Sequence, residues 1–402
     1  MISVERALEH IERCAHRLAP VEVSLRDATG LQLVEPVTSC LDSPPFDKSM
    51  LDGYAISSHA SSAKRRIVEE VIAGGVPHHA VEPDTTIRLM TGAPLPDGAD
   101  VVIKHEDTNL LDKETVELPS EIPASGAGVM KRGASFRADQ QVLDVGKRLS
   151  AVDIGLLAEV GRDLVQVVPK ARVAVLATGN ELVESGQPTS GGQICNSNGP
   201  MLLAALDEIS VPSIDLGIGP DDVEALRERF RMGLEADVLV VTGGVSAGVM
   251  DLVPGVLKQL GVAEVFHKVK MKPGKPLWFG VRESDSQRTL VFGLPGNPVS
   301  TLVSMELFVK PALRAMAGEE FSSPSSVQGV LTQPIGHRGG RPTYYPCRID
   351  FGRREAGKPT VETLAWRGSA DLAALTHANA LAVLPAGDYQ YAIGQEVDVI
   401  TL

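Results

Sequence analysis

Hydrophobic and polar positions follow two different periodicities along the chain, one helical and one typical of β-strands. Residues 3–18 carry apolar side chains at helical spacing behind Ser3, a suitable N-cap, which predicts an amphipathic helix. Residues 42–139 consist of short β-like runs broken by Gly and Pro, which predicts a β-rich module. A helical pattern returns over residues 152–161. The first part of the chain is therefore predicted to be a β-module with helical segments on both sides of it in sequence.

The pattern changes at residue 170. Near-continuous Val/Ile/Leu runs alternate with amphipathic segments to about residue 317, which is typical of βαβ units around a parallel sheet. Strands are predicted over 171–179, 211–219, 236–244, 263–272 and 289–296, and helices over 200–209, 221–233, 253–261 and 297–309. Residues 321–329 (FSSPSSVQG) are predicted to be a linker, and the remainder is again β-rich.

Composition narrows the class of protein. Of 402 residues, 43% are hydrophobic and 22% charged, which excludes global disorder, and a formal net charge of −13 argues against general nucleic-acid binding. No apolar run is long enough to span a membrane, and the first residues lack the apolar core of a signal peptide. Four well-separated cysteines indicate no disulfide framework. A multidomain cytoplasmic protein is expected.

A glycine-rich loop, TGGVSAGVMD (242–251), follows a predicted buried strand. Ligands of open parallel sheets bind beyond the carboxyl ends of the strands, and glycine lets backbone N–H groups approach a ligand closely. The loop is therefore a candidate phosphate or ligand loop, although a purely structural turn is an alternative. The glycines concerned are Gly243, Gly244 and Gly248.

The same loop matches G-x-S-x-G, the nucleophile elbow of hydrolases, with Ser246 as the nucleophile. That alternative needs an acid and a histidine further along the chain. Asp350 and His377 are available, but both lie beyond the α/β segment.

Two further segments could bind an anion. In LPGNPVS (294–300), Asn297 is predicted as an N-cap and Pro298 as the first helical residue, so the site is either anion-binding or simply a well-capped helix. In FHKVKMKPGKP (266–276), lysines 268, 270 and 272 alternate, and a strand would put them on one face with Lys275 following. This is either an oxyanion site or an edge strand protected by lysines.

Acidic residues recur at predicted turns and helix starts. Each alone is explained as a cap or turn residue, but together near glycine loops and lysines they suggest a Mg²⁺–phosphate site. They are Asp52, Glu181, Asp221, Asp222 and Asp251.

Taken in order, seven motifs resemble the molybdopterin molybdenumtransferase family, that is, bacterial MoeA, which is similar to the E domain of gephyrin. The motifs are PPFDKSMLDGYAI (44–56), RLMTGAPLPDGADVVI (88–103), VLATGNEL (175–182), CNSNGPML (195–202), TGGVSAG (242–248), MKPGKP (271–276) and GLPGNPVS (293–300). The resemblance spans residues 3 to about 318 and, more weakly, the C-terminal part.

The resemblance implies a multidomain α/β fold. The implied domains are residues 1–41 with 140–169 as an extended, partly helical domain, 42–139 as an inserted β-rich module, 170–318 as a three-layer molybdopterin-binding α/β domain with a parallel-rich sheet, and 319–402 as a β-barrel. It also implies an elongated homodimer whose cleft joins the α/β domain of one subunit to the β-module of the other.

The implied reaction converts adenylyl-molybdopterin and molybdate into molybdenum cofactor and AMP with the help of Mg²⁺. The resemblance assigns catalytic roles to Asp52, Thr91, Glu181, Asp251, Lys268 and Lys272, and molybdate binding to Lys272, Lys275, Arg348 and Ser369. It assigns substrate binding to Gly243, Gly244, Ser246, Gly248, Asn297, Pro298 and Ser300, and metal binding to Asp221 and Asp251.

One segment departs from the family pattern. Residues 132–135 are Arg-Gly-Ala-Ser where the family usually has Arg-Gly-Glu-Asp, so a metal or hinge role for that loop is not carried over. Alternatives within the resemblance are a non-catalytic pterin-binding or scaffold protein, and insertion of tungstate. A molybdopterin adenylyltransferase and apo-molybdoenzymes are the expected partners, with neither nucleic acid nor membrane.

Overall fold

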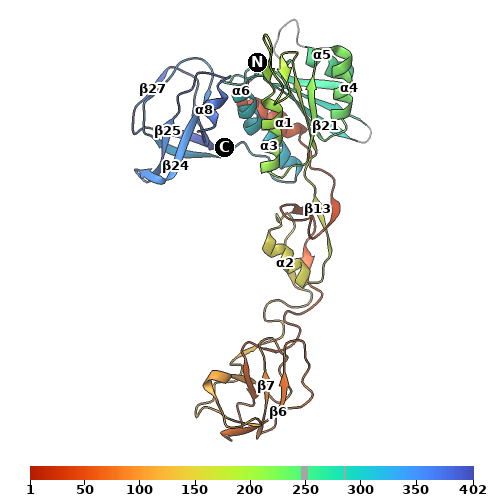
Figure 1. Ribbon diagram of the computed structural model, residues 1–402, viewed down its shortest axis with the longest axis vertical. Helices are drawn as coiled ribbons and strands as arrows, with labels where there is room; N and C mark the ends of the chain where they lie inside the picture. The colour runs from red at the N-terminus through yellow and green to blue at the C-terminus, as the bar shows by residue number, and fades with distance from the viewer. Residues whose placement is uncertain (246–251, 285–286) are drawn as a thin grey trace. The chain divides into compact units, whose positions relative to one another are not determined.

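The computed structural model describes residues 1–245, 252–284 and 287–402, and it divides into two compact units (Figure 1). The first unit contains residues 1–21 and 168–402, and the second contains residues 22–167. Asp251, Ser246 and Gly248, which the sequence singled out, lie outside the described residues.

A mixed six-stranded sheet forms the centre of the first unit. Its strand order is β17-β14-β18-β21-β20-β19; the first four strands are parallel to one another, and β20 is antiparallel to both of its neighbours, β21 and β19. The strands are β14 (Val173–Thr178), β17 (Ser213–Gly219), β18 (Val238–Thr242), β19 (Val262–His267), β20 (Trp278–Glu283) and β21 (Arg288–Leu294). The predicted three-layer α/β fold class is confirmed.

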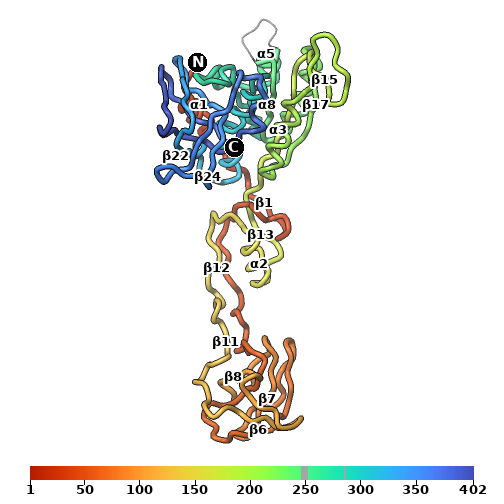
Figure 2. The backbone as a smooth tube through the Cα atoms, turned by 60° about the vertical axis from the view of Figure 1, so that its left-hand side comes forward, coloured from red at the N-terminus to blue at the C-terminus, as the bar shows by residue number. Residues whose placement is uncertain are grey.

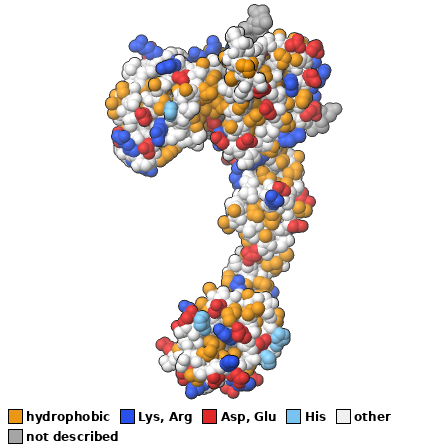
Figure 3. Space-filling view, viewed as in Figure 1, with side chains coloured by type: hydrophobic (Ala, Val, Ile, Leu, Met, Phe, Trp, Pro, Cys, Tyr) orange, Lys and Arg blue, Asp and Glu red, His pale blue; other side chains and the backbone are white. Residues whose placement is uncertain are grey.

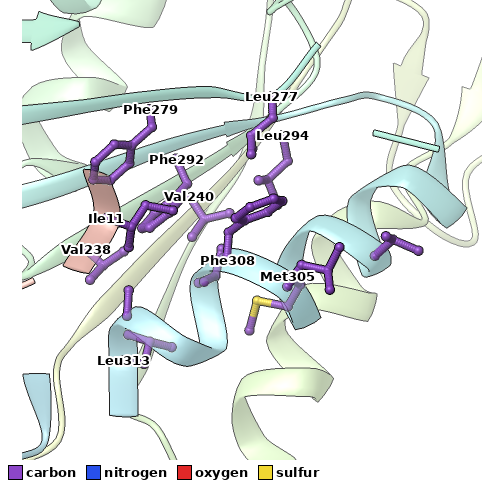
Figure 4. Packing of buried hydrophobic residues seen from close by; sticks show 14 of the residues in the cluster. Ile11, Val238, Val240, Leu277, Phe279, Phe292, Leu294, Met305, Phe308 and Leu313 are labelled. Carbon is purple, nitrogen blue, oxygen red and sulfur yellow. The ribbon is translucent and has the colours of Figure 1, made fainter. Parts of the chain in front are cut away.

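Helices cover both faces of this sheet because alternate strand residues point to opposite sides. Val173, Val175, Val238 and Val240 pack into one core, and Ala174, Leu176, Leu239 and Val241 pack into the other. The first core includes residues of α1 (Val4–Cys14), α3 (Asn198–Glu208) and α7 (Lys310–Met316), and the second includes residues of α4 (Val223–Gly233) and α5 (Leu252–Gln259). Figure 4 shows Phe308 and Leu313 facing Phe292 and Val240.

The N-terminal helix packs differently from the sequence-based grouping. Residues 1–41 were predicted to join 140–169, but α1 buries Ile11 in the α/β core, beside Val238 and Phe279 (Figure 4). Ile2 continues this attachment, because its N–H donates to the Lys268 carbonyl at 3.1 Å and its carbonyl accepts from Lys270 at 2.7 Å. The first 21 residues therefore belong to the first unit.

The lysine-rich segment after β19 also differs from the prediction. The strand predicted over 263–272 ends at His267, and β20 was not predicted at all. The N–H of Lys268 donates to the Leu277 carbonyl, and Lys268 has a positive φ of 72°. The chain turns back on itself there, so lysines 268, 270 and 272 do not share one face of a strand.

The helix after β21 contains a wide turn. It starts as α6 (Pro298–Ser304), passes through a π-helical turn, η2 (Met305–Val309), and continues as α7. Every residue of η2 is buried. Glu306 and Lys310 form an ion pair there, in which burial raises the pKa of Glu306.

Residues beyond 325 form a closed barrel, which confirms the predicted C-terminal barrel fold (Figure 2). Its order is β22-β25-β24-β26-β28, formed by β22 (Ser326–Leu331), β24 (Thr343–Glu355), β25 (Lys358–Thr363), β26 (Ala380–Leu384) and β28 (Glu396–Thr401). A small sheet of β23 (Ile335–His337) and β27 (Tyr389–Tyr391) and a short helix, α8 (Leu372–Leu375), accompany it. The predicted linker 321–329 is shorter than expected because β22 begins at Ser326.

The second unit is mainly β-structure, as its Gly- and Pro-interrupted runs predict. A six-stranded sheet has the order β8-β5-β7-β6-β10-β9, and its strands are β5 (Gly53–Ile56), β6 (Lys64–Val71), β7 (Thr85–Leu89), β8 (Val101–Lys104), β9 (Asn109–Leu110) and β10 (Thr115–Glu117). A 3₁₀ turn, η1 (His105–Asp107), follows β8.

Smaller elements complete this part of the chain. They are the sheet of β1 (Val21–Ser24), β13 (Leu164–Val168) and β2 (Gln32–Leu33), the pairs β3 (Val37–Thr38) with β12 (Gln141–Leu143) and β4 (Lys48–Ser49) with β11 (Val129–Met130), and helix α2 (Ala151–Glu159). In the first unit, β15 (Leu182–Val183) pairs with β16 (Ile194–Cys195). None of the helices in the described ranges has the length and apolar character that crossing a membrane requires.

Candidate functional site

A cavity of about 490 Å³ lies in the first unit, where loops of the α/β part meet the barrel. Its basic lining residues are Lys272, Lys275, Arg338, Arg341 and Arg367. Its other polar lining residues include Asn297, Ser300, His337, Thr343, Tyr345, Trp366 and Ser369. The structure therefore brings together five of the residues expected at the site, from segments that lie up to about 100 positions apart in sequence.

Lys272 is fixed to the start of the barrel through its backbone. Its N–H donates to the Pro342 carbonyl at 2.9 Å, and its own carbonyl accepts from the N–H of Tyr344 at 2.8 Å. The side chains of Lys272 and Lys275 remain exposed. Lys268, expected at the site as well, is half-buried and is not among the residues that line the cavity.

Three arginines line this cavity, and Arg348 is not one of them. Arg341 donates from one terminal nitrogen to the Met271 carbonyl at 3.1 Å, beside Lys272. Arg348 lies on β24 between the buried Cys347 and Ile349, so the alternation of the strand turns it to the outer face, opposite Glu362. The expected grouping of Arg348 with the two lysines is corrected accordingly.

The start of α6 contributes a hydrogen-bonded pair to the wall. Asn297 is the N-cap, but its side chain makes no capping bond and instead donates to Ser369 Oγ at 2.9 Å. The N–H of Val299 donates to the Ser369 carbonyl at 3.1 Å. Pro298, also expected in the site, occupies the first helical position and does not line the cavity.

Charge in this cavity is one-sided. None of the described residues that line it is Asp or Glu. Its two lysines and three arginines form no ion pair with a described carboxylate. Because like charges held close together repel one another unless solvent or an anion compensates them, this arrangement is suited to a multiply charged anion.

The carboxyl ends of β14 and β18 form a separate close-packed corner. Gly243 has a φ of 93°, and a Cβ there would collide with the Thr178 carbonyl, so only glycine fits. Its N–H donates to the Leu294 carbonyl at 3.1 Å. The side chain of Asn198 bridges Thr242 Oγ1 at 2.8 Å and the Gly296 carbonyl at 2.7 Å. The described start of the glycine-rich loop, residues 242–245, thus lies at the strand ends, as predicted.

The acidic residues at this edge form no complete cation site. Asp221 Oδ2 accepts from the Asn180 N–H at 3.3 Å, and the Asp221 N–H donates to Asn180 Oδ1 at 3.0 Å. Glu181 is exposed, and Asp222 caps α4 by accepting from Glu224 and Ala225. No set of three or more metal-binding side chains occurs within the described ranges. Asp221 retains one free carboxylate oxygen, which fits a Mg²⁺ shared with substrate phosphates rather than held by protein alone.

The hydrolase alternative finds no support in the described residues. Asp350 accepts from the N–H groups of Gly352 and Arg353, as a turn residue does, and His377 lines a different cavity from Asp350.

In the second unit, Asp52 and Thr91 come together as the sequence motifs suggest. Asp52 Oδ1 accepts from the N–H of Thr91 at 2.6 Å and from its hydroxyl at 2.7 Å. These bonds, together with the charges of His105 and Arg88, hold the pKa of the Asp52 carboxyl below its usual value. Gly53 permits this corner because a Cβ there would overlap the Ile103 carbonyl.

The loop that lacks the usual acids lies in this unit too. Asp47 accepts from the side chain of Lys131 and the N–H of Arg132, both at 2.8 Å, and Asp42 pairs with Arg132 Nε at 2.5 Å. Lys131 and Arg132, which precede Ala134 and Ser135, are therefore each paired with a carboxylate.

Comparison with known proteins places these features in one family. Residues 2–161 match the MoeA N-terminal region (domains I and II), residues 174–315 a probable molybdopterin-binding domain, and residues 328–402 the MoeA C-terminal region (domain IV). The chain is 32% identical to the molybdopterin molybdenumtransferase of Staphylococcus epidermidis over 99% of its own length and 95% of that protein. The chain belongs to the molybdopterin molybdenumtransferase, or MoeA, family.

Other MoeA relatives agree. The molybdopterin molybdenumtransferase of Haemophilus influenzae is 31% identical over 94% of this chain and 92% of its own length. A crystal structure of the molybdopterin biosynthesis MoeA protein from Pyrococcus horikoshii has a TM-score of 0.79 and 30% identity, and covers 100% of this chain and 99% of that one. A second structure from that organism has a TM-score of 0.75 and 27% identity, with full coverage of both chains.

Several cavity residues of this MoeA chain were missed by sequence reasoning. Arg338, Arg341 and His337 lie before β24, and Trp366 and Arg367 lie just before Ser369. Their proximity in sequence to Ser369 and to the start of a predicted barrel strand is the one signal that was available. No motif marked them, because the barrel contributes single residues from separate loops.

Proposed function

We propose that this chain inserts molybdenum into molybdopterin, converting adenylyl-molybdopterin and molybdate into molybdenum cofactor and AMP within molybdenum cofactor biosynthesis. The observation that carries the proposal is the cavity with five basic side chains and no carboxylate among its described lining residues. Lys272 and Lys275, from the segment KPGK (272–275), line this cavity. Relatives of the chain are named molybdopterin molybdenumtransferases, which agrees with the proposal.

The cavity explains how two anions can react. Molybdate is a dianion, and the dithiolene sulfurs that replace its oxygens carry negative charge when they bind a metal. Lys272, Lys275 and Arg341 reduce the repulsion between them, and Arg341 is already oriented by Met271. The Asn297–Ser369 pair adds a neutral contact to the same anion. The molybdate oxygens that the sulfurs displace take up the thiol protons and leave as water. Hydrolysis of the phosphoanhydride bond by water then releases AMP and leaves the phosphate on the pterin.

The nucleotide end of the substrate is assigned to the strand-end corner. Gly244, which has a positive φ, would offer its backbone N–H to the phosphates, whereas the N–H of Gly243 already donates to the Leu294 carbonyl and Gly243 is assigned to the close approach of the backbone. Asp221 and Asp251 would hold Mg²⁺ at this corner. A bound Mg²⁺ would neutralise part of the phosphate charge there. Glu181 follows the end of β14 by three residues and is assigned a catalytic role.

Asp52 and Thr91 are assigned to the same reaction from the β-module of a second subunit. This assignment needs the homodimer that the family resemblance implies. A molybdopterin adenylyltransferase and apo-molybdoenzymes are the proposed donor and acceptor proteins, and the cytoplasm is the proposed location.

The deciding experiment mixes purified protein with adenylyl-molybdopterin, Mg²⁺ and molybdate, and follows AMP release together with reconstitution of a molybdenum-free apo-enzyme. Molybdate-dependent AMP release with reconstitution is expected. Pterin that stays intact would refute the transferase, and tight pterin binding without turnover would indicate a scaffold protein instead. Replacing molybdate by tungstate in the same assay determines which oxyanion is preferred.

A further inference from the structure

The loop between β21 and α6 (residues 294–297) is a wall that the strand-end corner shares with the anion cavity. Pro295 and Asn297 line the cavity. The same loop packs against the start of the glycine-rich loop, because a Cβ at Gly296 would lie 3.6 Å from the Cα of Gly243. The position of this shared wall therefore determines the distance between the corner and the cavity.

Three successive carbonyls of the shared wall accept hydrogen bonds from groups at the corner. The N–H of Gly243 donates to Leu294 at 3.1 Å, Thr242 Oγ1 donates to Pro295 at 3.3 Å, and Asn198 Nδ2 donates to Gly296 at 2.7 Å. A loop outside regular secondary structure is held in place by the partners that its backbone groups find. The bond from Asn198 is the shortest of the three, and it comes from a different element, α3.

The orientation of the Asn198 amide follows from its partners. The Gly296 carbonyl can only accept, so the atom that faces it is Nδ2. A second hydrogen of Nδ2 goes to Thr242 Oγ1 at 2.8 Å, and that hydroxyl can pass its own hydrogen to Pro295. Asn198 Oδ1 is buried and has no hydrogen-bond partner among the described residues. The side chain therefore contributes two donors, of which one holds the corner and the other holds the shared wall.

We propose that Asn198 is a positioning residue, which keeps the strand-end corner and the anion cavity at the spacing that a substrate bound across both requires. The inference rests on the proposed function, in which the nucleotide end of the substrate lies at the corner and its dithiolene end lies at the cavity. Asn198 acts through Thr242 and Gly296 rather than on the substrate itself. A ligand that spans two subsites depends on the distance between them, whereas a ligand that occupies one subsite does not.

Binding to the full-length protein tests this difference. Calorimetric titration gives separate affinities for adenylyl-molybdopterin, AMP and molybdate. Asn198→Ala is expected to weaken binding of adenylyl-molybdopterin about tenfold and to change the affinities for AMP and molybdate by less than about twofold, because only the first ligand spans the two subsites. Equal losses for all three ligands would overturn the inference, and so would an unchanged affinity for adenylyl-molybdopterin.

Asn198→Asp separates the loss of the donors from the loss of volume. The side chain keeps its size, but a carboxylate cannot donate to the Gly296 carbonyl. A negative charge in the first turn of a helix is favourable, so α3 should remain folded even if the alanine variant does not. The aspartate variant is expected to lose as much affinity for adenylyl-molybdopterin as the alanine variant. An affinity equal to that of the unmodified protein would overturn the role of the amide.

Asn196 is the matched control in the same segment. It is 5% exposed, and its Oδ1 accepts from the N–H of Gly199 at 3.0 Å, a bond that stays within the start of α3. Asn196→Ala is expected to lower the melting temperature at least as much as Asn198→Ala and to leave the affinity for adenylyl-molybdopterin unchanged. Equal losses of affinity in the two variants would contradict the inference, because they would attribute the effect to the stability of α3.

A double-mutant cycle tests the route through Thr242. Thr242→Val removes the hydroxyl that accepts from Asn198 and donates to Pro295. Because both side chains hold the same wall, the combined variant is expected to bind adenylyl-molybdopterin no more than about twofold more weakly than the weaker single variant. Fully additive losses would overturn this route.

Turnover separates failure of the inference from failure of the proposed function. With Mg²⁺ and molybdate present, the kcat of AMP release is expected to fall about 10- to 100-fold in Asn198→Ala, because small misplacements of reacting groups are costly. The molybdate concentration needed for half-maximal release should change little. If the proposed function is wrong, the unmodified protein releases no AMP, but the difference between spanning and single-site ligands persists. If the inference alone is wrong, the unmodified protein and Asn198→Ala release AMP at the same rate.

Discussion

The cation-rich cavity of the first unit and the Asp52 corner of the second differ in whether their charged side chains have partners within the protein. The cavity holds five basic side chains that no described carboxylate neutralises. At the corner, one carboxylate oxygen receives two donors from a single threonine, and the charge is stabilised within the unit. Unpaired basic side chains in a cavity are available to bind an anionic ligand. A carboxylate that accepts two hydrogen bonds is instead kept ionised and in one orientation.

Removal of one cavity cation is expected to have the largest effect. Arg341→Ala should weaken molybdate binding by about 10- to 150-fold, the range that a lost hydrogen bond of about 1.5–3 kcal/mol to a charged group gives. Arg348→Ala is the matched control, because that arginine lies on the outer face of the barrel. Calorimetric titration with molybdate measures both. Equal losses in the two variants would mean that Arg341 has no special role.

The next expectation separates the two substrates. Lys275→Gln should raise the molybdate concentration needed for half-maximal AMP release more than it weakens binding of adenylyl-molybdopterin. The reason is that Lys275 lines the anion cavity and not the strand-end corner. Pterin affinity is measured by fluorescence titration. A parallel loss of both affinities would show that the lysine contacts the pterin or its phosphates instead.

A smaller effect is expected at the Asp52 corner. Thr91→Val removes one of two donors but preserves the backbone N–H, so the pKa of Asp52 should rise only part of the way toward its usual value. The carboxyl carbon shift of Asp52, followed by NMR through an acid titration, reports this directly. Thr91→Ser is the control that should restore the lower pKa. No change in Thr91→Val would assign the whole effect to the backbone.

The smallest effect concerns stability at low pH. Burial alone would raise the pKa of Glu69, but hydrogen bonds from His78 and His79 outweigh it and lower the pKa to about 2. Since this pKa is depressed on folding, its stabilising contribution is complete above the ordinary value of 4.5 and is lost as pH falls toward 2.

Glu69→Gln should therefore flatten the dependence of unfolding free energy on pH between about 4.5 and 2. Denaturant unfolding at several pH values measures that slope. An unchanged slope would show that Glu69 is not the group responsible. Histidine side chains on the face shown of the second unit are coloured pale blue in Figure 3.

Sequence reasoning identified residues that lie close together in the structure where each group comes from one short segment of the chain. The segment MKPGKP placed Lys272 and Lys275 together because a tight turn joins them, and LDGY and MTGAP supplied Asp52 and Thr91, which the sheet pairs through β5 and β7. Near-continuous apolar runs likewise predicted the parallel core strands, because burial on both faces leaves no polar alternation.

Sequence reasoning was wrong where the position of a side chain depends on tertiary contacts. Lys268 leaves the strand because its backbone bonds with Leu277, a partner that no local pattern reveals. Arg348 was grouped with the cavity lysines on the family resemblance, and the alternation of its strand was not taken into account. Cys347 and Ile349 are buried, and that alone directs Arg348 outward. His337 and Trp366 line the cavity only because separate segments of the barrel part meet the α/β part there.

The π-helical turn between α6 and α7 has a consequence for aligning this sequence with those of its relatives. A turn of this kind holds one residue more than the α-helical path would use, and it lets Ser300 line the cavity while Leu313 and Met316 stay in the core. Each residue of an α-helix turns the chain by about 100°, so a single-codon deletion here would rotate α7 out of its packing. When this chain is aligned with a relative whose helix is α-helical throughout, the one-residue gap belongs within Met305–Val309.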